Sequence, residues 1–335
     1  MMNSGFDSII GHRDVIAHLT GSIGSGRISH AYLFTGEAGS GKKTMADAFA
    51  MALECRDGSK PAPCLICPSC RKAADHNHPD ILYVTHEKPN LISVKEIREQ
   101  VVETVDILPY ESRWKVYIIP DAEKMNQQAQ NALLKTIEEP PSYVVLILLS
   151  TAPEALLPTI LSRCVTLPLL PVADRDVDEF LRSEIHIPDY EAKVLTAFAQ
   201  GNIGKAVAAA TDSEFSERRD KTLGLIRRLR NMDTAAIAES VRQMKEDREH
   251  ISDILDIMRM WFRDVLCYKA TREVDQLIFA GEISEIRAEA RASSYAGLQE
   301  AAAAADRVES RLRANVNFEL TMELFLFSVK ENCHS

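Results

Sequence analysis

The most informative stretch of this 335-residue chain reads Gly36-Glu37-Ala38-Gly39-Ser40-Gly41-Lys42-Lys43-Thr44. It follows the short apolar run 31–35 and precedes a helix that we expect over 45–54. A strand, a glycine-rich turn and a helix in this order are the context of a phosphate-binding loop. Glycines let backbone N–H groups turn towards phosphate oxygens, and the helix N-terminus adds its positive end. We therefore predict a phosphate site here; the alternative is a tight turn that binds no ligand.

One position of this loop departs from the working pattern. Lys42 would reach the β- and γ-phosphates, and a Ser or Thr hydroxyl should follow it to hold Mg²⁺. The chain has Lys43 at that position, and Thr44 comes only after it. Lys43 has no metal-ligating oxygen and adds a second positive charge. The sequence therefore predicts a loop that receives phosphate but lacks a magnesium ligand, and it leaves open whether ATP or ADP binds without Mg²⁺.

The composition is that of an ordinary soluble protein. Hydrophobic residues make up 46% of the chain and charged residues 26%, and the length allows two or three domains. No apolar run approaches the ~20 residues of a membrane span, and the N-terminus lacks the features of a signal peptide. We expect a cytoplasmic protein with no membrane partner. The net charge of −10 argues against non-specific DNA binding driven by overall charge.

Four of the seven cysteines form a cluster with the spacing Cys-x8-Cys-x2-Cys-x2-Cys: Cys55, Cys64, Cys67 and Cys70. Disulfides are rare in the cytoplasm, so another use is expected. Four thiolates brought together suit tetrahedral Zn²⁺ at Zn–S distances of ~2.3 Å, and such a closed site is structural. We predict a zinc module at 55–70, with a metal-free cysteine-rich loop as the alternative. His76 and His78 lie just beyond it and are expected at the surface.

Strand-like and helix-like segments alternate after this module. Apolar runs predict strands at 81–84, 116–119 and 144–149, and helices are predicted from the capping box Ser93-Val94-Lys95-Glu96 onwards and over 126–138. The expected fold class is therefore α/β, with a mostly parallel sheet and helices on both faces. Ligands of such sheets bind at the carboxyl ends of the strands. Residues 36–44, Pro120-Asp121 and Ser150-Thr151 should then surround one site.

The last part of the chain has a different composition. None of the fourteen prolines follows Pro188. A small helical unit is expected over 172–210, and several long amphipathic helices are expected after Asp212. One strong apolar stripe consists of Ile254, Ile257, Met258, Trp261, Phe262 and Leu266. We expect most of this stripe to form an intramolecular core, while the last helices could leave a face for a partner subunit.

Four features, in this order, resemble the clamp-loader family of AAA+ ATPases. They are the phosphate loop, the cysteine module after it, the stretch Asn131-Ala132-Leu133-Leu134-Lys135-Thr136-Ile137-Glu138-Glu139-Pro140-Pro141, and Ser162-Arg163-Cys164. The likeness covers residues 6–210, and the C-terminal helices match only in length and helical character. It implies a P-loop AAA+ domain at 1–170 with the zinc module inserted, a small helical lid domain at 171–210 and an all-helical collar domain for oligomerisation at 211–335.

The resemblance also implies roles for single residues. The Walker A loop would consist of Gly36, Gly39, Gly41, Lys42, Lys43 and Thr44. Motor subunits of the family carry Asp-Glu where this chain has Pro120-Asp121, so the magnesium-binding Asp is replaced. Ser150-Thr151 fall on the sensor-1 region, and Gly204, followed by Lys205, stands where motor subunits carry the sensor-2 Arg. Arg163 matches the arginine that acts on a neighbour's ATP; without the resemblance it would be a surface arginine ending a helix.

These departures all remove parts of metal-assisted phosphoryl transfer. The leading interpretation is a non-hydrolysing subunit of the clamp loader of a bacterial DNA polymerase, which completes the AAA+ ring and lends Arg163 in trans. Its expected partners are the motor ATPase subunits, a delta-like subunit and, through the complex, the sliding clamp and primer–template DNA. Two alternatives stay open: an active clamp-loader ATPase subunit, and a zinc-stabilised nucleotide-sensing DNA-binding protein.

Overall fold

The chain divides into two compact units. The computed structural model describes residues 5–57 and 62–333. One unit comprises Met1–Val177 and Gly201–Lys205, and the other comprises Asp178–Gln200 and Ala206–Ser335. The segment 201–205 therefore returns to the first unit after the chain has entered the second. The three-domain division at 170 and 210 stays a prediction, and residues 58–61 of the predicted zinc module lie outside the described residues.

The first unit is built on a five-stranded parallel sheet with the strand order β2-β3-β4-β1-β5. Its strands are β1 (Ala31–Thr35), β2 (Ile81–Tyr83), β3 (Lys115–Ile119), β4 (Val144–Ser150) and β5 (Val165–Pro168). The predicted parallel α/β sheet is confirmed, and four strands lie where the apolar runs predict them. No apolar run in the sequence marks β5, because this edge strand has four residues, ends in a proline and buries only Leu167.

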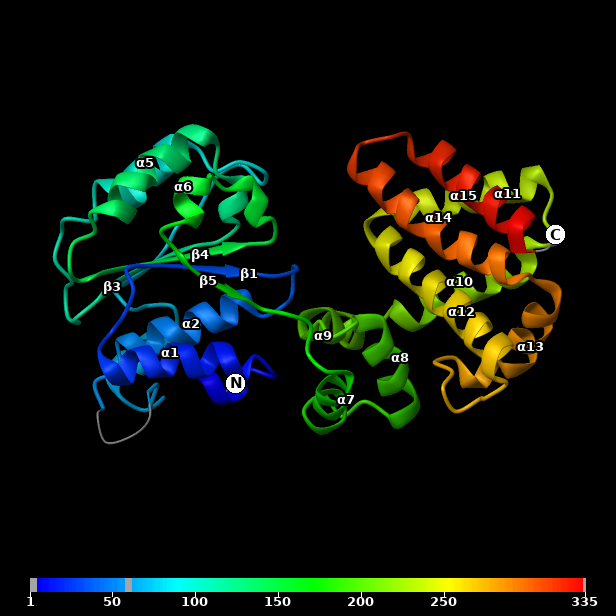
Figure 1. Cartoon of the computed structure of the whole chain (residues 1–335), viewed down its shortest axis with the longest axis horizontal. Coiled ribbons are helices and arrows are strands. Elements are labelled where there is room, and N and C mark those ends of the chain that lie inside the picture. The colour runs from blue at the N-terminus through cyan, green and yellow to red at the C-terminus, as the bar shows by residue number, and fades with distance from the viewer. Residues whose placement is uncertain (1–4, 58–61, 334–335) are drawn as a thin grey trace. The chain divides into compact units, whose positions relative to one another are not determined.

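Helices cover both faces of this sheet. In Figure 1, α1 (Arg13–Ser25) and α2 (Lys42–Leu53) lie on one face, and α5 (Gln127–Glu138) and α6 (Pro158–Leu161) lie on the other. The shorter elements are η1 (Phe6–Ser8), α3 (Pro68–Ala74), α4 (Val94–Ile97), the π-helical turn η2 (Arg98–Val102), η3 (Ala122–Lys124) and η4 (Pro153–Ala155). The capping box predicted at Ser93 is confirmed, because Ser93 and Glu96 exchange side-chain and backbone hydrogen bonds at the start of α4.

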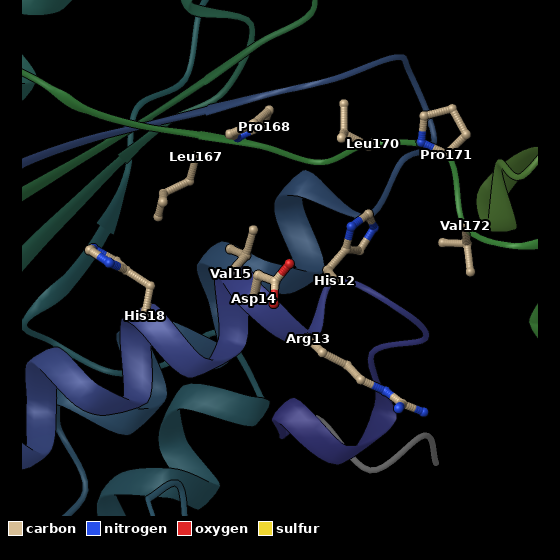
Figure 2. Close-up of a pocket in the computed structure, with 10 residues that line it drawn as sticks. All are labelled: His12, Arg13, Asp14, Val15, His18, Leu167, Pro168, Leu170, Pro171 and Val172. Carbon is tan, nitrogen blue, oxygen red and sulfur yellow. The ribbon is translucent and has the colours of Figure 1, made fainter.

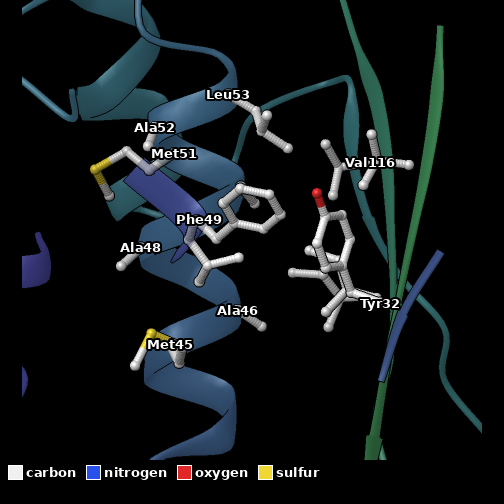
Figure 3. Close-up of a cluster of buried hydrophobic side chains, with 14 of the residues drawn as sticks. Tyr32, Met45, Ala46, Ala48, Phe49, Met51, Ala52, Leu53 and Val116 are labelled. Atoms are coloured by element: carbon white, nitrogen blue, oxygen red, sulfur yellow. The ribbon is translucent and has the colours of Figure 1, made fainter. Parts of the chain in front are cut away.

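The side chains of β1 alternate between two cores. Tyr32 and Phe34 belong to the core on the α1–α2 face, whereas Ala31 and Leu33 belong to the core on the opposite face. On the first face, the ring of Phe49 from α2 packs edge-on against Tyr32, with the ring centroids 5.0 Å apart (Figure 3). Burial on both faces explains why the central strands are continuous apolar runs rather than alternating ones.

The second unit is helical. It contains parts of α7 (Asp174–Ser183) and α9 (Ile203–Thr211), and also α8 (Asp189–Ala199), α10 (Phe215–Leu229), α11 (Thr234–Glu246), η5 (Arg248–His250), α12 (Ile251–Thr271), η6 (Ala280–Glu282), α13 (Ile283–Ala292), α14 (Tyr295–Arg313) and α15 (Phe318–Cys333). The predicted apolar stripe is the buried face of α12, although Leu266 at its end is only half-buried. Among the described residues, no helix combines the length and the hydrophobicity of a membrane span.

Candidate functional site

The phosphate loop lies at the carboxyl ends of β1 and β4. The chain leaves β1 at Thr35, and the N–H of Gly36 donates to the carbonyl of Ser150, the last residue of β4. Gly36, Gly39 and Gly41 have φ angles of 151°, 82° and 89°, which L-residues with a side chain rarely adopt. Left-handed Gly41 is the N-cap of α2, so this helix starts at Lys42, before the predicted start. The backbone therefore has the strand–turn–helix form that a phosphate site requires.

Lys42 is folded back onto its own loop. Its Nζ donates to the carbonyl oxygens of Gly36 at 2.7 Å and of Glu37 at 2.6 Å. Burial lowers the pKa of Lys42, and the nearby carboxylates of Glu123, Asp121 and Glu37 act in the opposite direction. Protein oxygen atoms thus already occupy this ammonium group, and a phosphate would have to replace them.

The ammonium group of Lys43 lies against an aromatic ring. Its Nζ is 5.9 Å from the ring centroid of Tyr83, at the end of β2, and the side chain is exposed. The hydroxyl of Tyr83 donates to Asp47, one turn further along α2. The contact is of the cation–π type, which binds a cation to the face of a ring. The position that offers a hydroxyl in magnesium-binding loops therefore presents a cation bound to a neighbouring strand.

The segment after β3 brings the carboxylate of Glu123 to the phosphate loop, and the sequence pattern does not predict this residue as part of the site. Glu123, in η3, accepts a hydrogen bond from the hydroxyl of Thr151 at 2.6 Å, and its other carboxylate oxygen is buried without a partner among the described residues. Asp121 has a φ of 49° and pairs with Lys124 at 2.9 Å. The strand ends thus gather Asp121, Glu123 and Thr151 near Lys42, and nothing in the local sequence marks Glu123, since it follows the strand by several residues.

The segment Gly201–Lys205 packs its backbone directly onto the phosphate loop. The amide of Asn202 donates to the carbonyl of Ala38 at 2.8 Å, and the N–H of Gly204 donates to the carbonyl of Gly39 at 3.0 Å. A Cβ atom at Gly204 would lie 2.5 Å from that carbonyl oxygen and 2.7 Å from the Cα of Gly39. The position therefore accepts no side chain in this arrangement, and Asn202 is a second residue that sequence reasoning missed.

A groove of about 400 Å³ opens next to the start of α1 (Figure 2). Its lining comes from two stretches of the first unit: His12, Arg13, Asp14, Val15 and His18 on one side, and Leu167, Pro168, Leu170, Pro171 and Val172 on the other. His12 lies close to the phosphate loop, where the backbone of Ser40 acts on its ring and raises its pKa, against the larger effect of burial. Burial lowers the pKa of His12. The ring therefore faces the loop as a neutral group at neutral pH.

The four clustered cysteines converge in space at the far end of α2 from the phosphate loop. Their sulfur atoms all lie within 4.8 Å of one another, and Sγ of Cys64 is 3.9 Å from Sγ of Cys70. A tetrahedron with Zn–S bonds of ~2.3 Å has sulfur atoms ~3.8 Å apart, so the group fits this ion. Cys55 follows the C-cap of α2, which at ~1.5 Å per residue lies about 18 Å from the first residue of that helix. A metal here is too far from the loop to take part in its chemistry.

Backbone N–H groups support negative charge on these sulfur atoms. The N–H groups of Cys64, Cys67 and Cys70 donate to the sulfur atoms of Cys55, Cys64 and Cys67 at 3.4, 3.3 and 3.4 Å, respectively. Burial raises the pKa of the Cys67 thiol, but hydrogen bonds from the backbone of Arg56 and Cys70 and from neighbouring thiols outweigh burial and lower the pKa to about 6. Burial raises the pKa of the Cys55 and Cys70 thiols. Thiolates are the form in which cysteine binds metal, so a metal ion would have to displace protons from these two sulfur atoms.

The expectation that His78 lies at the surface is wrong. Its side chain is buried, and its Nδ1 accepts from the N–H of Asp80 at 3.2 Å, while its Nε2 lies 3.0 Å from the hydroxyl of Ser69. Burial lowers the pKa of His78, which favours the neutral ring that these contacts require. His76 is exposed as predicted. The sequence could not show the difference, because the polar partners of His78 come from separate segments: Ser69 in α3, Asp80 just before β2 and Ser112 just before β3.

Arg163 lies between α6 and β5, with its side chain 41% exposed. Its Nε is 3.0 Å from a carboxylate oxygen of Glu138 at the end of α5. Its Nη1 donates to the carbonyl of Thr159 at 3.0 Å and to the hydroxyl of Ser162 at 3.2 Å. The next residue, Cys164, is partly buried, and burial raises the pKa of its thiol to about 11. The arginine is therefore accessible but already oriented by its own chain.

Comparison with known proteins agrees with this architecture. The family model for DNA polymerase III, delta subunit, matches residues 11–173, and the model for DNA polymerase III, delta subunit, C terminal, matches residues 214–331. The DNA polymerase III subunit delta' of Bacillus subtilis (strain 168) is 32% identical over 321 residues, which cover 95% of each chain. The DNA polymerase III subunit tau of Escherichia coli (strain K12) is 32% identical over 211 residues, 61% of this chain and 32% of that one. A solved structure of a DNA polymerase III gamma subunit-related protein from Thermotoga maritima aligns with a TM-score of 0.48 and 20% identity, over 97% of this chain and all of that chain.

The parallel sheet, its glycine-rich loop and the helical region after it define a P-loop protein of the AAA+ type. Within that class, the chain belongs to the delta-prime family of DNA polymerase III subunits, which are subunits of the clamp-loader type.

Proposed function

We propose that this chain is a non-hydrolysing subunit of a bacterial DNA polymerase III clamp loader. The observation that carries the proposal is the chemistry at the two positions that should bind magnesium. Lys43 stands in place of a hydroxyl, with its ammonium group against Tyr83, and Pro120 stands in place of a carboxylate. Phosphoryl transfer in this class depends on Mg²⁺ to bridge and neutralise the β- and γ-phosphates. At these two positions the loop therefore offers the ion no protein ligand.

Three further features of the loop support the absence of hydrolysis. Lys42 is engaged by backbone carbonyls, and the carboxylates of Glu123 and Asp121 lie close enough to affect its charge. Carboxylates beside the lysine repel the triphosphate that it would attract. At Gly204 the chain has no side chain to reach a γ-phosphate, and the contact with Gly39 leaves no room for one.

We further propose that Arg163 acts in trans, on ATP held by a neighbouring motor subunit. Its side chain is 41% exposed and precedes β5 at the amino ends of the strands, whereas the phosphate loop lies at their carboxyl ends. An arginine supplied to another subunit's ATP stabilises charge in the transition state and contributes ~10³–10⁵ in rate. In this role the chain completes the AAA+ ring without consuming ATP itself.

The proposed partners follow from a position in the AAA+ ring of the clamp loader. The direct partners are the motor ATPase subunits and a delta-like subunit. The sliding clamp and primer–template DNA are partners through the complex. The Bacillus subtilis and Escherichia coli relatives described above are subunits of DNA polymerase III by name, which supports a shared complex. We propose a cytoplasmic location and no membrane partner.

For the cysteine module we propose structural Zn²⁺ bound by Cys55, Cys64, Cys67 and Cys70. The ion would join the end of α2 to the start of α3 and leave no open coordination position. This role is supported by the distance between the module and the phosphate loop. It also accounts for four thiols held within reach of one another beside a hydrophobic core.

Magnesium-dependent ATP turnover by the isolated chain tests the first proposal. We expect no turnover above the background without protein, with the cognate motor subunit as the positive control. Turnover by the isolated chain would favour an active ATPase subunit instead. Salt-dependent binding of the isolated chain to DNA would favour the nucleotide-sensing DNA-binding alternative, because phosphate contacts release counterions.

A further inference from the structure

The guanidinium group of Arg163 is held on two of its three nitrogen atoms. Nε faces the carboxylate of Glu138 at 3.0 Å, and Nη1 donates to Thr159 and Ser162. Among the described residues, Nη2 makes no hydrogen bond. The contacts come from two different helices, α5 and α6, so they define the direction of the side chain and not only its position. The nitrogen left free is a donor that could meet a phosphate oxygen.

A buried glutamine fixes the distance between these two helices. The amide of Gln130, in α5, donates to the carbonyls of Met125 and Ala155, and its carbonyl oxygen accepts from the N–H of Leu157, just before α6, at 2.7 Å. Its side chain is 4% exposed, so these bonds are sheltered from water. The hydrogen bonds of Gln130 therefore fix α5, which carries Glu138, relative to α6, which precedes Arg163.

We propose that Glu138 is a positioning residue for Arg163, holding the guanidinium in the orientation in which it reaches a neighbour's ATP. This inference rests on the proposed trans-acting role of Arg163. A long, flexible arginine loses rotamer freedom when it meets a phosphate, and a side chain ordered in advance loses less. Thr159 and Ser162 restrain one end of the planar group, and the charge of Glu138 sets its rotation.

The Glu138 carboxylate aligns the arginine without blocking it. Both side chains are exposed by more than two fifths, 45% for Glu138 and 41% for Arg163. Exposed ion pairs are screened by water and salt, so this pair contributes little to the stability of the fold. A triphosphate offers several negative oxygens and can take the free Nη2 while Nε keeps its pair.

Glu138→Gln is the decisive variant, because it removes the charge and keeps the size of the side chain. Glu139→Gln is the matched control, since Glu139 is the adjacent exposed carboxylate and has no ion pair in the part of the chain that the structure describes. In NMR spectra of the isolated chain, we expect the Arg163 side-chain resonances to shift and to become more mobile in Glu138→Gln. They should stay unchanged in Glu139→Gln.

The second measurement is ATP turnover by the reconstituted complex with clamp and primed DNA. We expect Glu138→Gln to lower kcat by about 10-fold, below the ~10²-fold that a 1 Å misplacement costs, without changing the KM for ATP. The KM should hold because the neighbour's own loop binds the nucleotide. In the Arg163→Ala background, Glu138→Gln should have no further effect, since the two residues act as one unit.

The outcomes separate this inference from the proposal on which it rests. If Arg163→Ala slows the complex but Glu138→Gln does not, or if Glu138→Gln speeds it, the positioning role is wrong and the trans-acting arginine survives. An additional loss from Glu138→Gln in the Arg163→Ala background also overturns the positioning role. If Arg163→Ala itself has no effect on turnover, the trans-acting role fails and the positioning role fails with it.

Discussion

At the scale of single residues, Gly204 shows what packing adds to a sequence comparison. In the sequence, Gly204 only stands where the resemblance places the sensor-2 arginine of motor subunits. In the structure, its backbone contacts Gly39 and leaves no space for a Cβ atom. Lys42 and Thr151 could be assigned to the site because strand ends predict their location. Glu123 and Asn202 could not, because they reach the loop through turns whose path depends on tertiary packing.

Gly204→Ala should therefore lower the free energy of unfolding of the first unit by roughly 1–3 kcal/mol, the usual cost of forcing atoms into a packed space. Gly21→Ala, in the same unit, is the control. It lies in α1 with no atom within 4 Å of the added Cβ, and should raise stability by about 0.4–1 kcal/mol.

The two tryptophans allow each unit to be followed by itself. Trp114 belongs to the first unit and Trp261 to the second, and both are buried. Denaturant unfolding of the Gly204 and Gly21 variants in a Trp261→Phe background reports on Trp114 alone. Equal stability of Gly204→Ala and its parent would show that the 201–205 segment does not pack on the loop as described.

At the scale of elements, the apolar runs predict β1 to β4 because those strands are buried on both faces. β5 escapes prediction because an edge strand needs little hydrophobicity. The π-helical turn η2 also escapes, since a change of hydrogen-bond register inside a helix leaves no mark in the apolar spacing. The return of residues 201–205 to the first unit is a tertiary feature, and the local sequence shows only a helix end at Gly201.

The packing of α14 against α15 depends on Gly297. A Cβ atom there would clash with the carbonyl of Asn332, in the backbone of α15. We expect Gly297→Ala to lower the free energy of unfolding of the second unit by about 1–3 kcal/mol or more. Gly224→Ala, in α10 with nothing within 4 Å, should raise it by about 0.4–1 kcal/mol. Trp261 fluorescence in a Trp114→Phe background measures both, and a neutral Gly297→Ala would contradict the described contact.

The cysteine module was predictable because its spacing alone brings four thiols within reach of one metal ion. Elemental analysis of chain purified without chelators should find one zinc per chain, lost in Cys67→Ser and retained in Cys267→Ser, which changes a cysteine outside the cluster. Metal removal should also destabilise the first unit, as followed by Trp114, because metal binding contributes free energy of folding. A metal-free parent protein would refute the zinc assignment.

For the molecule as a whole, we propose separate roles for the phosphate loop, which does not hydrolyse ATP, and for Arg163, which acts on the ATP of another subunit. The loop keeps its glycines and Lys42 but lacks both magnesium ligands, so the chain is expected not to hydrolyse ATP. Arg163 precedes β5 with its side chain 41% exposed, and in the proposed role it acts on a neighbour's ATP. The sequence could predict both features through matched motifs, whereas the subunit that receives Arg163 is a property of the complex and not of one chain.

ATP turnover by the cognate motor subunits with DNA and clamp is the decisive test of a non-hydrolysing chain that supplies Arg163 in trans. Complexes that contain this chain are compared with complexes that contain Arg163→Ala, and the chain alone serves as the control. We expect the isolated chain to be inert, and the complex with Arg163→Ala to assemble but to hydrolyse ATP more slowly. ATP hydrolysis by the isolated chain, or full turnover with Arg163→Ala, would contradict this expectation.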